Sequence, residues 1–293
     1  MSAAFQTVEE VQALLASSGY VAHYGLASAI FLACRLPQPL LLEGEPGVGK
    51  TELARALAGG LETTFIRLQC YEGIDSREAL YEWNYLEQLL EIRKHESARA
   101  PDEGRETDLF TWRFLQPRPL LRALLESNES PAVLLIDEID RADEAFEAFL
   151  LEFLSDFAIT IPEIGGVRAR VAPIVVITSN RTRELHDGLK RRCLFHWVEY
   201  PSLEQELAIV QLRAPEVLPE LAAAVALAVR RLRGLDLQKP PGVAESIAWS
   251  RAVRALGRDE LTREVARQTL GVVIKNRDDW ERVTESRDAW LAG

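Results

Sequence analysis

A glycine-rich loop carries the strongest chemical signal in the chain. Residues 44–51 read Gly-Glu-Pro-Gly-Val-Gly-Lys-Thr, which is the pattern G-x-x-x-x-G-K-[ST]. Its glycines let backbone N–H groups converge on phosphate oxygens, Lys50 would reach the β- and γ-phosphates, and the Thr51 hydroxyl would reach Mg²⁺. The alternative is a glycine-rich turn with a chance Lys-Thr pair, but the complete pattern between an apolar run and a helical one favours nucleotide binding. The residues expected to contact the nucleotide are Glu45, Pro46, Gly47, Val48, Gly49, Lys50, Thr51 and Glu52.

Two adjacent acids supply the second signal. The run from Val133 to Ile136 is fully apolar, as in a strand buried on both faces of a parallel sheet, and Asp137 and Glu138 follow it. Open α/β sheets place their ligands at this carboxyl edge. Asp137 would hold Mg²⁺ through water, and Glu138 would orient and deprotonate the attacking water. Alone, the run could be a strand followed by a helix cap, but downstream of a complete phosphate loop it predicts a hydrolytic site.

Composition limits the classes of function. The chain has 293 residues, 47% of them hydrophobic, and a formal net charge of −11, so a folded protein without a general affinity for nucleic acid or anionic membrane is expected. The sequence has no run apolar enough to span a bilayer and no signal-peptide pattern at its start, which favours a cytoplasmic protein. Cys34, Cys70 and Cys193 have no metal-ligand spacing and are interpreted as buried apolar thiols.

The elements that would position these residues alternate between helix and strand. Thr7 and Glu10 form a capping box before a helix expected over 8–17, and a second helix is expected over 23–35. Further strands are expected at 64–68 and 174–178, with a β-hairpin over 159–171.

Between the second strand and the acids, the pattern is less regular. Five apolar residues predict the core-facing stripe of one helix: Leu80, Trp83, Leu86, Leu89 and Leu90. The polar segment 95–108, which contains Pro101 and Gly104, is expected to be an insert into the fold. From the Ser202/Gln205 capping box onwards the pattern is helical. The predicted fold is therefore an α/β core with a parallel sheet flanked by helices in residues 1–200, and an all-helical domain in residues 201–293.

The order of these parts resembles that of the AAA+ ATPases, in which the helical C-terminal domain is a lid. Two features resemble the MoxR branch of this family. They are the hairpin at 159–171 and the sequence around the phosphate loop, Leu-Leu-Glu-Gly-Glu-Pro-Gly-Val-Gly-Lys-Thr-Glu-Leu-Ala. Residues 71–75 and 79–85 resemble the subgroup associated with maturation of molybdenum-containing carbon monoxide dehydrogenase. The resemblance implies a P-loop NTPase that uses ATP and Mg²⁺, assembles into a homo-oligomeric ring such as a hexamer, and acts as a chaperone for a metalloenzyme, with a von Willebrand factor A domain protein as a further partner.

The resemblance also assigns roles to single residues. Asn180 matches the sensor asparagine that positions the lytic water, and Gln69 matches a polar residue that restrains Glu138. Arg192 matches the arginine finger, the residue that reaches the γ-phosphate bound by a neighbouring subunit, and Arg191 is the alternative candidate. A structural explanation is also open, because cationic residues commonly stabilise the C-terminal end of a helix.

One departure concerns the lid. The MoxR branch usually has an arginine at the start of a lid helix, but the equivalent residues 243–249 contain none. Arg251 or Arg254, further along the same helix, could replace it.

Three classes of function follow from these residues. The leading hypothesis is an ATP-hydrolysing chaperone that remodels or matures a client protein. A nucleotide-dependent binding switch with little turnover is the alternative, although a positioned Glu138 favours turnover. A motor on nucleic acid is disfavoured by the acidic balance. The sequence does not identify the client.

Overall fold

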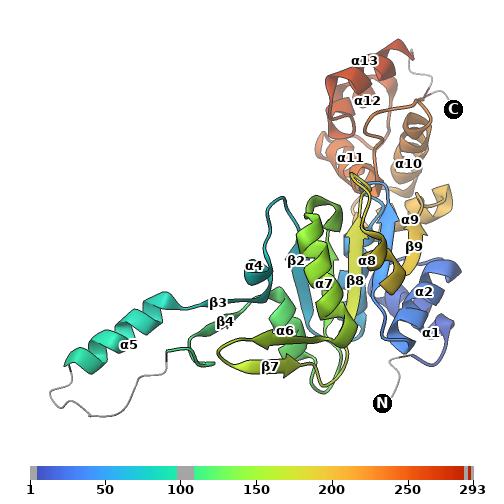
Figure 1. Ribbon diagram of the computed structural model, residues 1–293. Helices are drawn as coiled ribbons and strands as arrows, with labels where there is room; N and C mark the ends of the chain where they lie inside the picture. Colours follow the sequence, from blue (N-terminus) through green and yellow to red (C-terminus); the bar gives the residue numbers. More distant parts are fainter. Residues whose placement is uncertain (1–4, 98–108, 287–289, 292–293) are drawn as a thin grey trace. The chain divides into compact units, whose positions relative to one another are not determined.

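The computed structural model describes residues 5–97, 109–286 and 290–291 (Figure 1). The chain divides into two compact units. The first comprises Ala29–Leu42 and Leu61–Phe195 with the start of the chain up to Gln6, and the second comprises Thr7–Ser28, Glu43–Gly60 and His196–Gly293. The acids at 137 and 138 therefore belong to the first unit and the phosphate loop to the second. The boundary between an α/β domain and a helical domain near residue 200 stays a prediction.

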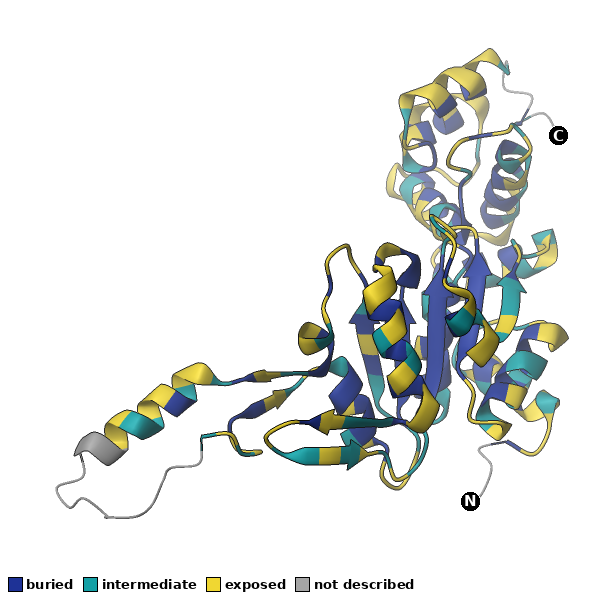
Figure 2. Cartoon of the chain, in the orientation of Figure 1, coloured by how far each residue is buried: buried dark blue, intermediate teal, exposed yellow. Residues whose placement is uncertain are grey.

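Five strands form the main sheet. In spatial order they are β2 (Phe65–Gln69), β5 (Val133–Asp137), β8 (Ile174–Ser179), β1 (Leu40–Gly44) and β9 (Leu194–Val198). Strand β5 is parallel to both of its neighbours, β2 and β8. Every residue of β5 and β8 is buried, and Figure 2 shows the central strands in dark blue. Complete burial explains why these segments are uninterrupted apolar runs rather than alternating ones.

Helices cover one face of this sheet in the first unit. They are α6 (Pro119–Glu126), α7 (Glu144–Asp156) and α8 (Asp187–Arg192). Their apolar residues form one cluster with alternate residues of the strands, namely Ile66, Leu68, Leu134, Ile136, Val175 and Ile177. Residues two apart on a strand point to the same side, so this cluster is the core beneath the three helices. It fixes the ends of β2, β5 and β8, where the polar residues follow.

Two short strand pairs extend from the sheet. The expected hairpin is present as β6 (Ala158–Ile161) and β7 (Gly165–Arg168), and Gly165 has φ +102°, a backbone conformation that favours glycine. The second pair, β3 (Tyr81–Trp83) with β4 (Leu115–Pro117), was not expected. Both pairs contribute to a small apolar cluster that includes Trp83, Phe114 and Ile161.

The prediction of a single core-facing helix around residues 80–90 was wrong. The chain forms α4 (Ser76–Leu80), then β3, then α5 (Tyr85–Ser97). The intervening strand breaks the helical phase, so the apolar residues of α5 do not continue the buried face of α4. Leu86 is 70% exposed and Leu89 is 57% exposed, whereas Gln88 is buried and donates a hydrogen bond to the Leu109 carbonyl at 2.6 Å. Figure 2 shows α5 mostly in yellow. Residues 98–108 of the expected insert lie outside the described residues.

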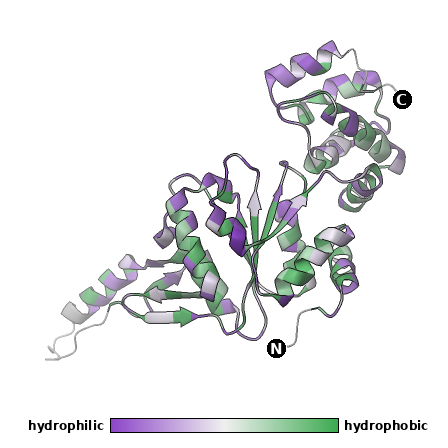
Figure 3. Ribbon diagram, turned by 45° about the vertical axis from the view of Figure 1, so that its right-hand side comes forward, coloured by the Kyte–Doolittle hydropathy of each residue, from purple (hydrophilic) through white to green (hydrophobic). Residues whose placement is uncertain are grey.

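The second unit is helical apart from strand ends and loops. Its helices are α1 (Val8–Ser17), α3 (Lys50–Gly60), α9 (Leu203–Arg213), α10 (Pro219–Arg233), α11 (Val243–Ala255), α12 (Arg263–Thr269) and α13 (Arg277–Glu285), and α2 (Tyr24–Arg35) begins in it. Both predicted N-cap residues lie at helix starts: the Thr7 hydroxyl accepts from Glu10 N, and Ser202 and Gln205 form a reciprocal capping box. Figure 3 shows green and purple stretches on the C-terminal helices, as amphipathic helices have.

Within the described ranges, every helix is too short or too polar to cross a bilayer.

A buried ion pair ties the helices of the second unit together. The guanidinium of Arg233, at the end of α10, donates to both carboxylate oxygens of Glu206 on α9, at 2.7 and 2.9 Å. Ser246 on α11 donates to the same carboxylate. Arg233 also stacks over the Tyr200 ring, 4.3 Å from its centroid. The Glu206 side chain is 1% exposed, so its charge depends on these partners.

We predict that Arg233→Met lowers the free energy of unfolding by about 3–5 kcal/mol, because it leaves the Glu206 carboxylate buried without its counter-ion. Urea unfolding followed by tryptophan fluorescence measures the loss. Arg277→Met is the matched control, since Arg277 is 89% exposed in its pair with Glu281, and it should cost less than about 0.5 kcal/mol. If Arg233→Met lowers the free energy of unfolding by less than about 1 kcal/mol, the buried Glu206 carboxylate does not depend on Arg233.

Candidate active site

The conformation of the phosphate loop depends on its glycines and on hydrogen bonds from its lysine. Gly47 and Gly49 have φ values of +78° and +96°, which side-chain-bearing residues rarely adopt. A Cβ on Gly44 would overlap the carbonyl oxygen of Val198. The buried Lys50 ammonium donates to the carbonyls of Gly44 at 2.6 Å and Glu45 at 2.8 Å, so it lies inside the loop at the start of α3.

The start of α11 lies directly on this loop. Val243 N donates to the Gly47 carbonyl at 3.0 Å, and a Cβ on Gly242 would come within 2.7 Å of the Gly47 Cα. The Glu245 carboxylate accepts from Gly242 N at 2.9 Å and completes the cap of α11. A side chain at either glycine would push the helix away from the loop. The sequence signal for this contact was the Pro-Gly at the start of a helical pattern, which was not interpreted.

A cavity of about 980 Å³ opens beside the loop, wholly within the second unit. Its apolar wall includes Val21, Val198 and Ile247, and its polar lining includes Glu52 and Arg251. The volume lies in the range of cofactor sites in proteins, and the mixture of an apolar wall with a few charged groups is typical of them. The cavity can therefore accept a nucleotide whose phosphates bind residues 47–51.

The cavity lining distinguishes the two candidate lid arginines. Arg251 lines the cavity, and its guanidinium contacts Glu216 Oε1 at 2.9 Å and the Arg213 carbonyl. Arg254 instead pairs with Asp259 and is not among the lining residues. Arg213 also lines the cavity and pairs with Glu52 of the expected nucleotide-binding set. The sequence reasoning missed Arg213, because α9 carries no motif around it.

Two histidines also line the cavity. The rings of His23 and His196 lie 5.2 Å apart, centroid to centroid, and His23 Nδ1 accepts from Leu26 N at the start of α2. Burial, and then the neighbouring His23, lower the pKa of His196. His196 is therefore neutral at neutral pH, and it contributes an uncharged ring rather than a cation.

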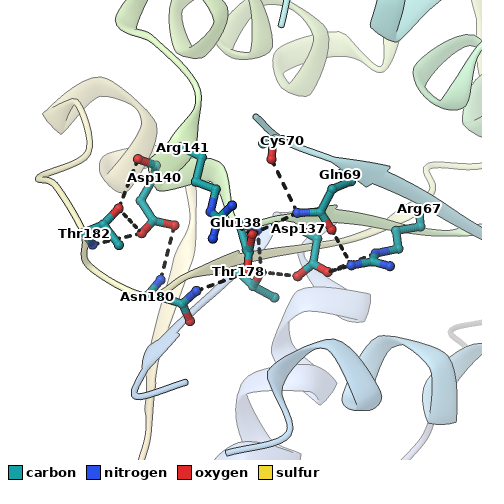
Figure 4. Close-up of polar contacts among 10 residues, drawn as sticks. All are labelled: Arg67, Gln69, Cys70, Asp137, Glu138, Asp140, Arg141, Thr178, Asn180 and Thr182. Atoms are coloured by element: carbon teal, nitrogen blue, oxygen red, sulfur yellow. Dashed lines mark hydrogen bonds and ion pairs between the residues drawn. The ribbon is translucent and has the colours of Figure 1, made fainter. Parts of the chain in front are cut away.

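In the first unit, Asp137 and Glu138 come together with the polar residues that follow β2 and β8 (Figure 4). Thr178 on β8 bridges the two acids: its hydroxyl donates to Asp137 Oδ1 at 2.6 Å and accepts from Glu138 N at 2.9 Å. Asn180 Nδ2 lies 3.5 Å from Glu138 Oε1. Gln69 Nε2 donates to Glu138 Oε2 at 3.0 Å. The structure therefore brings together the expected residues Gln69, Asp137, Glu138 and Asn180.

Glu138 has an unusual backbone. Its φ of 55° and ψ of 52° place it in the left-handed region, which costs a non-glycine residue of the order of 1–3 kcal/mol. The Thr178 contact to its N–H and the 3₁₀ turn that follows, Ile139–Arg141, fix this conformation. Strain of this kind is concentrated at functional sites.

Asp140 positions the loop that carries Asn180. This buried carboxylate accepts from Asn180 N at 3.2 Å, from Thr182 N at 2.9 Å and from the Thr182 hydroxyl at 2.7 Å. The contacts are drawn in Figure 4. The sequence reasoning missed Asp140, although a third acid after an acidic pair was a usable signal.

Two arginines also contact the acids. Arg67 on β2 pairs with Asp137, and Arg141 Nε lies 2.9 Å from Glu138 Oε2. Neither was predicted, because each pairing depends on strand register or on the turn after β5. Arg192, at the end of α8, is exposed and its guanidinium contacts Ser155, while Arg191 is exposed beside it.

The oxygen-rich donor set suits Mg²⁺. Asp137 is 2% exposed and its carboxylate is ordered by Thr178, and hard cations prefer carboxylate and hydroxyl ligands. The three thiols do not suit this role, because burial raises the pKa of Cys34, Cys70 and Cys193 to about 12 and keeps them protonated.

The comparisons with known proteins decide the family. Residues 40–199 match the model of the "ATPase family associated with various cellular activities (AAA)". The chain belongs to this family. This membership confirms the predicted fold class, ATP hydrolysis as the activity, and ATP with Mg²⁺ as cofactors.

The chain is also similar to the ATP-dependent zinc metalloproteases FtsH 1 of Sorangium cellulosum and FtsH 3 of Sphaerobacter thermophilus. It is 26% identical to the first over 252 residues and 27% identical to the second over 270 residues. The matches cover 82% and 88% of this chain, but 35% and 46% of the relatives, so this chain spans less than half of their length. Among solved structures, it is similar to the RuvB Holliday junction branch migration motor of Thermotoga maritima, with TM-score 0.46, 19% identity, and coverage of 85% of this chain and 67% of that one.

We predict that Arg251→Ala weakens ATP binding about tenfold, because it removes a cation from the wall of the cavity that holds the phosphate loop. Arg254→Ala, on the same helix but outside the cavity lining, is the matched control and should change the affinity less than about twofold. Isothermal titration calorimetry with ATP measures both. Equal losses for the two variants would show that the cavity lining does not select the lid arginine.

Proposed function

We propose that this AAA family ATPase belongs to the MoxR branch and uses ATP hydrolysis to remodel or mature a client metalloenzyme, such as a molybdenum hydroxylase. The observation that carries the hydrolytic part is the cluster in which Gln69 and Asn180 flank the Glu138 carboxylate. The support for the client class is narrower: it rests on the wording of residues 71–75 and 79–85, which resembles the carbon monoxide dehydrogenase subgroup.

Each site residue then has a role in hydrolysis. Residues 45–52 bind the nucleotide, with Lys50 against the β- and γ-phosphates. Thr51 would hold Mg²⁺ through its hydroxyl and Asp137 would hold it through water, and the metal would supply positive charge to the phosphates. Glu138 accepts a proton from the attacking water, and Asn180 holds that water in line. Gln69 restrains Glu138 through its amide.

One observation favours the alternative of a nucleotide-dependent switch. The Glu138 carboxylate is held by both Gln69 and Arg141, so it must leave these donors before it can reach an attacking water. Such a protein would bind ATP, recruit its partner and turn over slowly. A measured turnover well below about 1 per minute at saturating ATP would favour the switch over the chaperone.

The proposed assembly is a ring, in the form of a hexamer, with active sites shared between subunits. Arg192 is exposed at the C-terminal end of α8, where a neighbouring copy could meet it. A guanidinium supplied in this way stabilises charge that develops in phosphoryl transfer. The proposed location is the cytoplasm, and the proposed partners are the client and a von Willebrand factor A domain protein.

The proposed contact surface for the client is the exposed face of α5. Tyr85, Leu86, Leu89 and Leu90 are each at least 50% exposed on this helix. Consecutive exposed apolar residues of this kind mark interaction surfaces in proteins. The hairpin β6–β7 is the second proposed contact, since Gly165 and Gly166 leave open space around its turn.

We predict that Lys50→Ala reduces ATP affinity at least about a hundredfold, because it removes the charge that faces the β- and γ-phosphates. Lys239→Ala, at a lysine outside the loop, is the control and should leave the affinity unchanged. Fluorescence anisotropy with a labelled ATP analogue measures both. Near-native binding by Lys50→Ala would sink the nucleotide-site assignment.

A mixing experiment tests the shared active site. Arg192→Ala keeps Lys50, Asp137 and Glu138, whereas Glu138→Gln keeps the finger, and each variant alone should be inactive. In a randomly mixed ring about a quarter of the interfaces pair an intact site with an intact finger, so phosphate release should recover to about a quarter of the wild-type rate. Arg191→Ala is the control for the neighbouring arginine. If the mixture stays inactive although mass spectrometry shows subunit exchange, Arg192 does not act between subunits.

The α5 surface can be tested without touching the ATPase site. We expect Leu86→Glu/Leu89→Glu to abolish client maturation in a strain lacking the wild-type chain, while ATPase activity stays within about twofold of wild type. The matched control is Leu212→Glu/Leu256→Glu, which changes two other exposed leucines. Carbon monoxide oxidation by cell extracts is the readout. Full complementation by the α5 variant would exclude this face.

A further inference from the structure

The guanidinium of Arg67 contacts Asp137, the acid proposed to hold Mg²⁺. Its Nε and Nη2 lie 3.0 and 2.6 Å from Asp137 Oδ2, and the second carboxylate oxygen, Oδ1, accepts from the Thr178 hydroxyl at 2.6 Å. Figure 4 shows Arg67 reaching Asp137 from the neighbouring strand β2. Both oxygens of Asp137 are therefore engaged by donors of the chain itself.

This pairing is built into the strand register. Gln69 is paired with Asp137, and Arg67 with Leu135, in the parallel ladder between β2 and β5. Arg67 and Gln69 are two residues apart, so both side chains point to the face on which Asp137 lies. The Arg67 guanidinium also donates to Gln69 Oε1. Because a guanidinium only donates, it sets the orientation of the Gln69 amide and turns its NH₂ toward Glu138.

Ion pairs between two exposed side chains contribute little to stability. The pair of Arg67 with Asp137 differs from them because its acid is buried. The Asp137 side chain is 3% exposed, whereas the Arg67 side chain is 43% exposed. A buried carboxylate without a counter-ion is costly, while an arginine that is partly in water can leave at a small cost. A divalent cation that binds Asp137, directly or through water, competes with Arg67 for the same carboxylate. The guanidinium and the metal are thus alternative counter-ions for one carboxylate.

We propose that Arg67 is a built-in counter-ion that stabilises Asp137 while no metal is bound and that must be displaced when Mg²⁺ arrives with the nucleotide. The inference rests on the proposed role of Asp137 as a metal-binding residue. Arg67 is a positioning residue, since it acts through Asp137 and Gln69. Its presence sets a threshold: the site accepts Mg²⁺ less readily than an identical site without the arginine, and the metal-free protein is more stable.

The test compares Arg67→Met with Arg67→Lys. Binding of a fluorescent, non-hydrolysable ATP analogue is titrated at fixed free Mg²⁺ concentrations, and melting temperatures are measured in EDTA. Arg67→Met should lower the half-saturating free Mg²⁺ concentration about fivefold and lower the melting temperature in EDTA, because Asp137 loses its competing counter-ion. Arg67→Lys retains the charge and should stay within about twofold of wild type. Arg67→Gln is measured in parallel in case the methionine variant misfolds.

Two controls separate the possible failures. Arg118→Met removes a similarly exposed arginine of the first unit from its pair with Glu82, leaves the ion pair with Asp137 in place and should not change the Mg²⁺ requirement. Asp137→Asn should abolish the Mg²⁺ dependence of binding of the ATP analogue. If wild type and Asp137→Asn show the same Mg²⁺ dependence, the proposed role of Asp137 is wrong. If Asp137→Asn loses the dependence but Arg67→Met and Arg67→Gln require as much Mg²⁺ as wild type, the counter-ion proposal alone is overturned.

Discussion

Two carboxylates side by side at the end of one buried strand are the constraint on which the site depends. Asp137 and Glu138 repel each other and are costly to bury, so each needs donors that do not belong to β5. The neighbouring strands supply them: Thr178 from β8, and Arg67 and Gln69 from β2. A parallel sheet brings the carboxyl ends of its strands to one edge, which makes this convergence possible.

The parts of the fold that could be predicted are those whose signal is local. The phosphate loop depends on its own glycines, and the strand at 133–137 is recognisable because burial on both faces requires an unbroken apolar run. The partners Arg67 and Arg141 could not be assigned, since each contact depends on strand register or on the left-handed turn at Glu138. The α5 error has the same origin: three residues of β3 interrupted a helical period that looked continuous.

The second unit assembles its cavity from segments far apart in sequence. Residues near the start of α2, the phosphate loop, the chain after β9 and α11 all contribute to the lining. The close approach of Gly47 and Gly242 couples the loop to the first turn of α11. A nucleotide in this cavity would therefore contact both the loop that holds its phosphates and the helix that carries Arg251. This arrangement offers a physical route from nucleotide state to the position of α11.

Glu138 is proposed to act as the base in the chemical step of ATP hydrolysis. Single-turnover cleavage of radiolabelled ATP by wild type and by Glu138→Gln, with excess protein and saturating Mg²⁺, measures that step without product release. We expect the substitution to slow cleavage by about 10²–10⁴-fold and to leave ATP affinity unchanged, because the amide keeps the shape of the side chain but cannot accept the proton. Cleavage by Glu138→Gln within about threefold of the wild-type rate would contradict it.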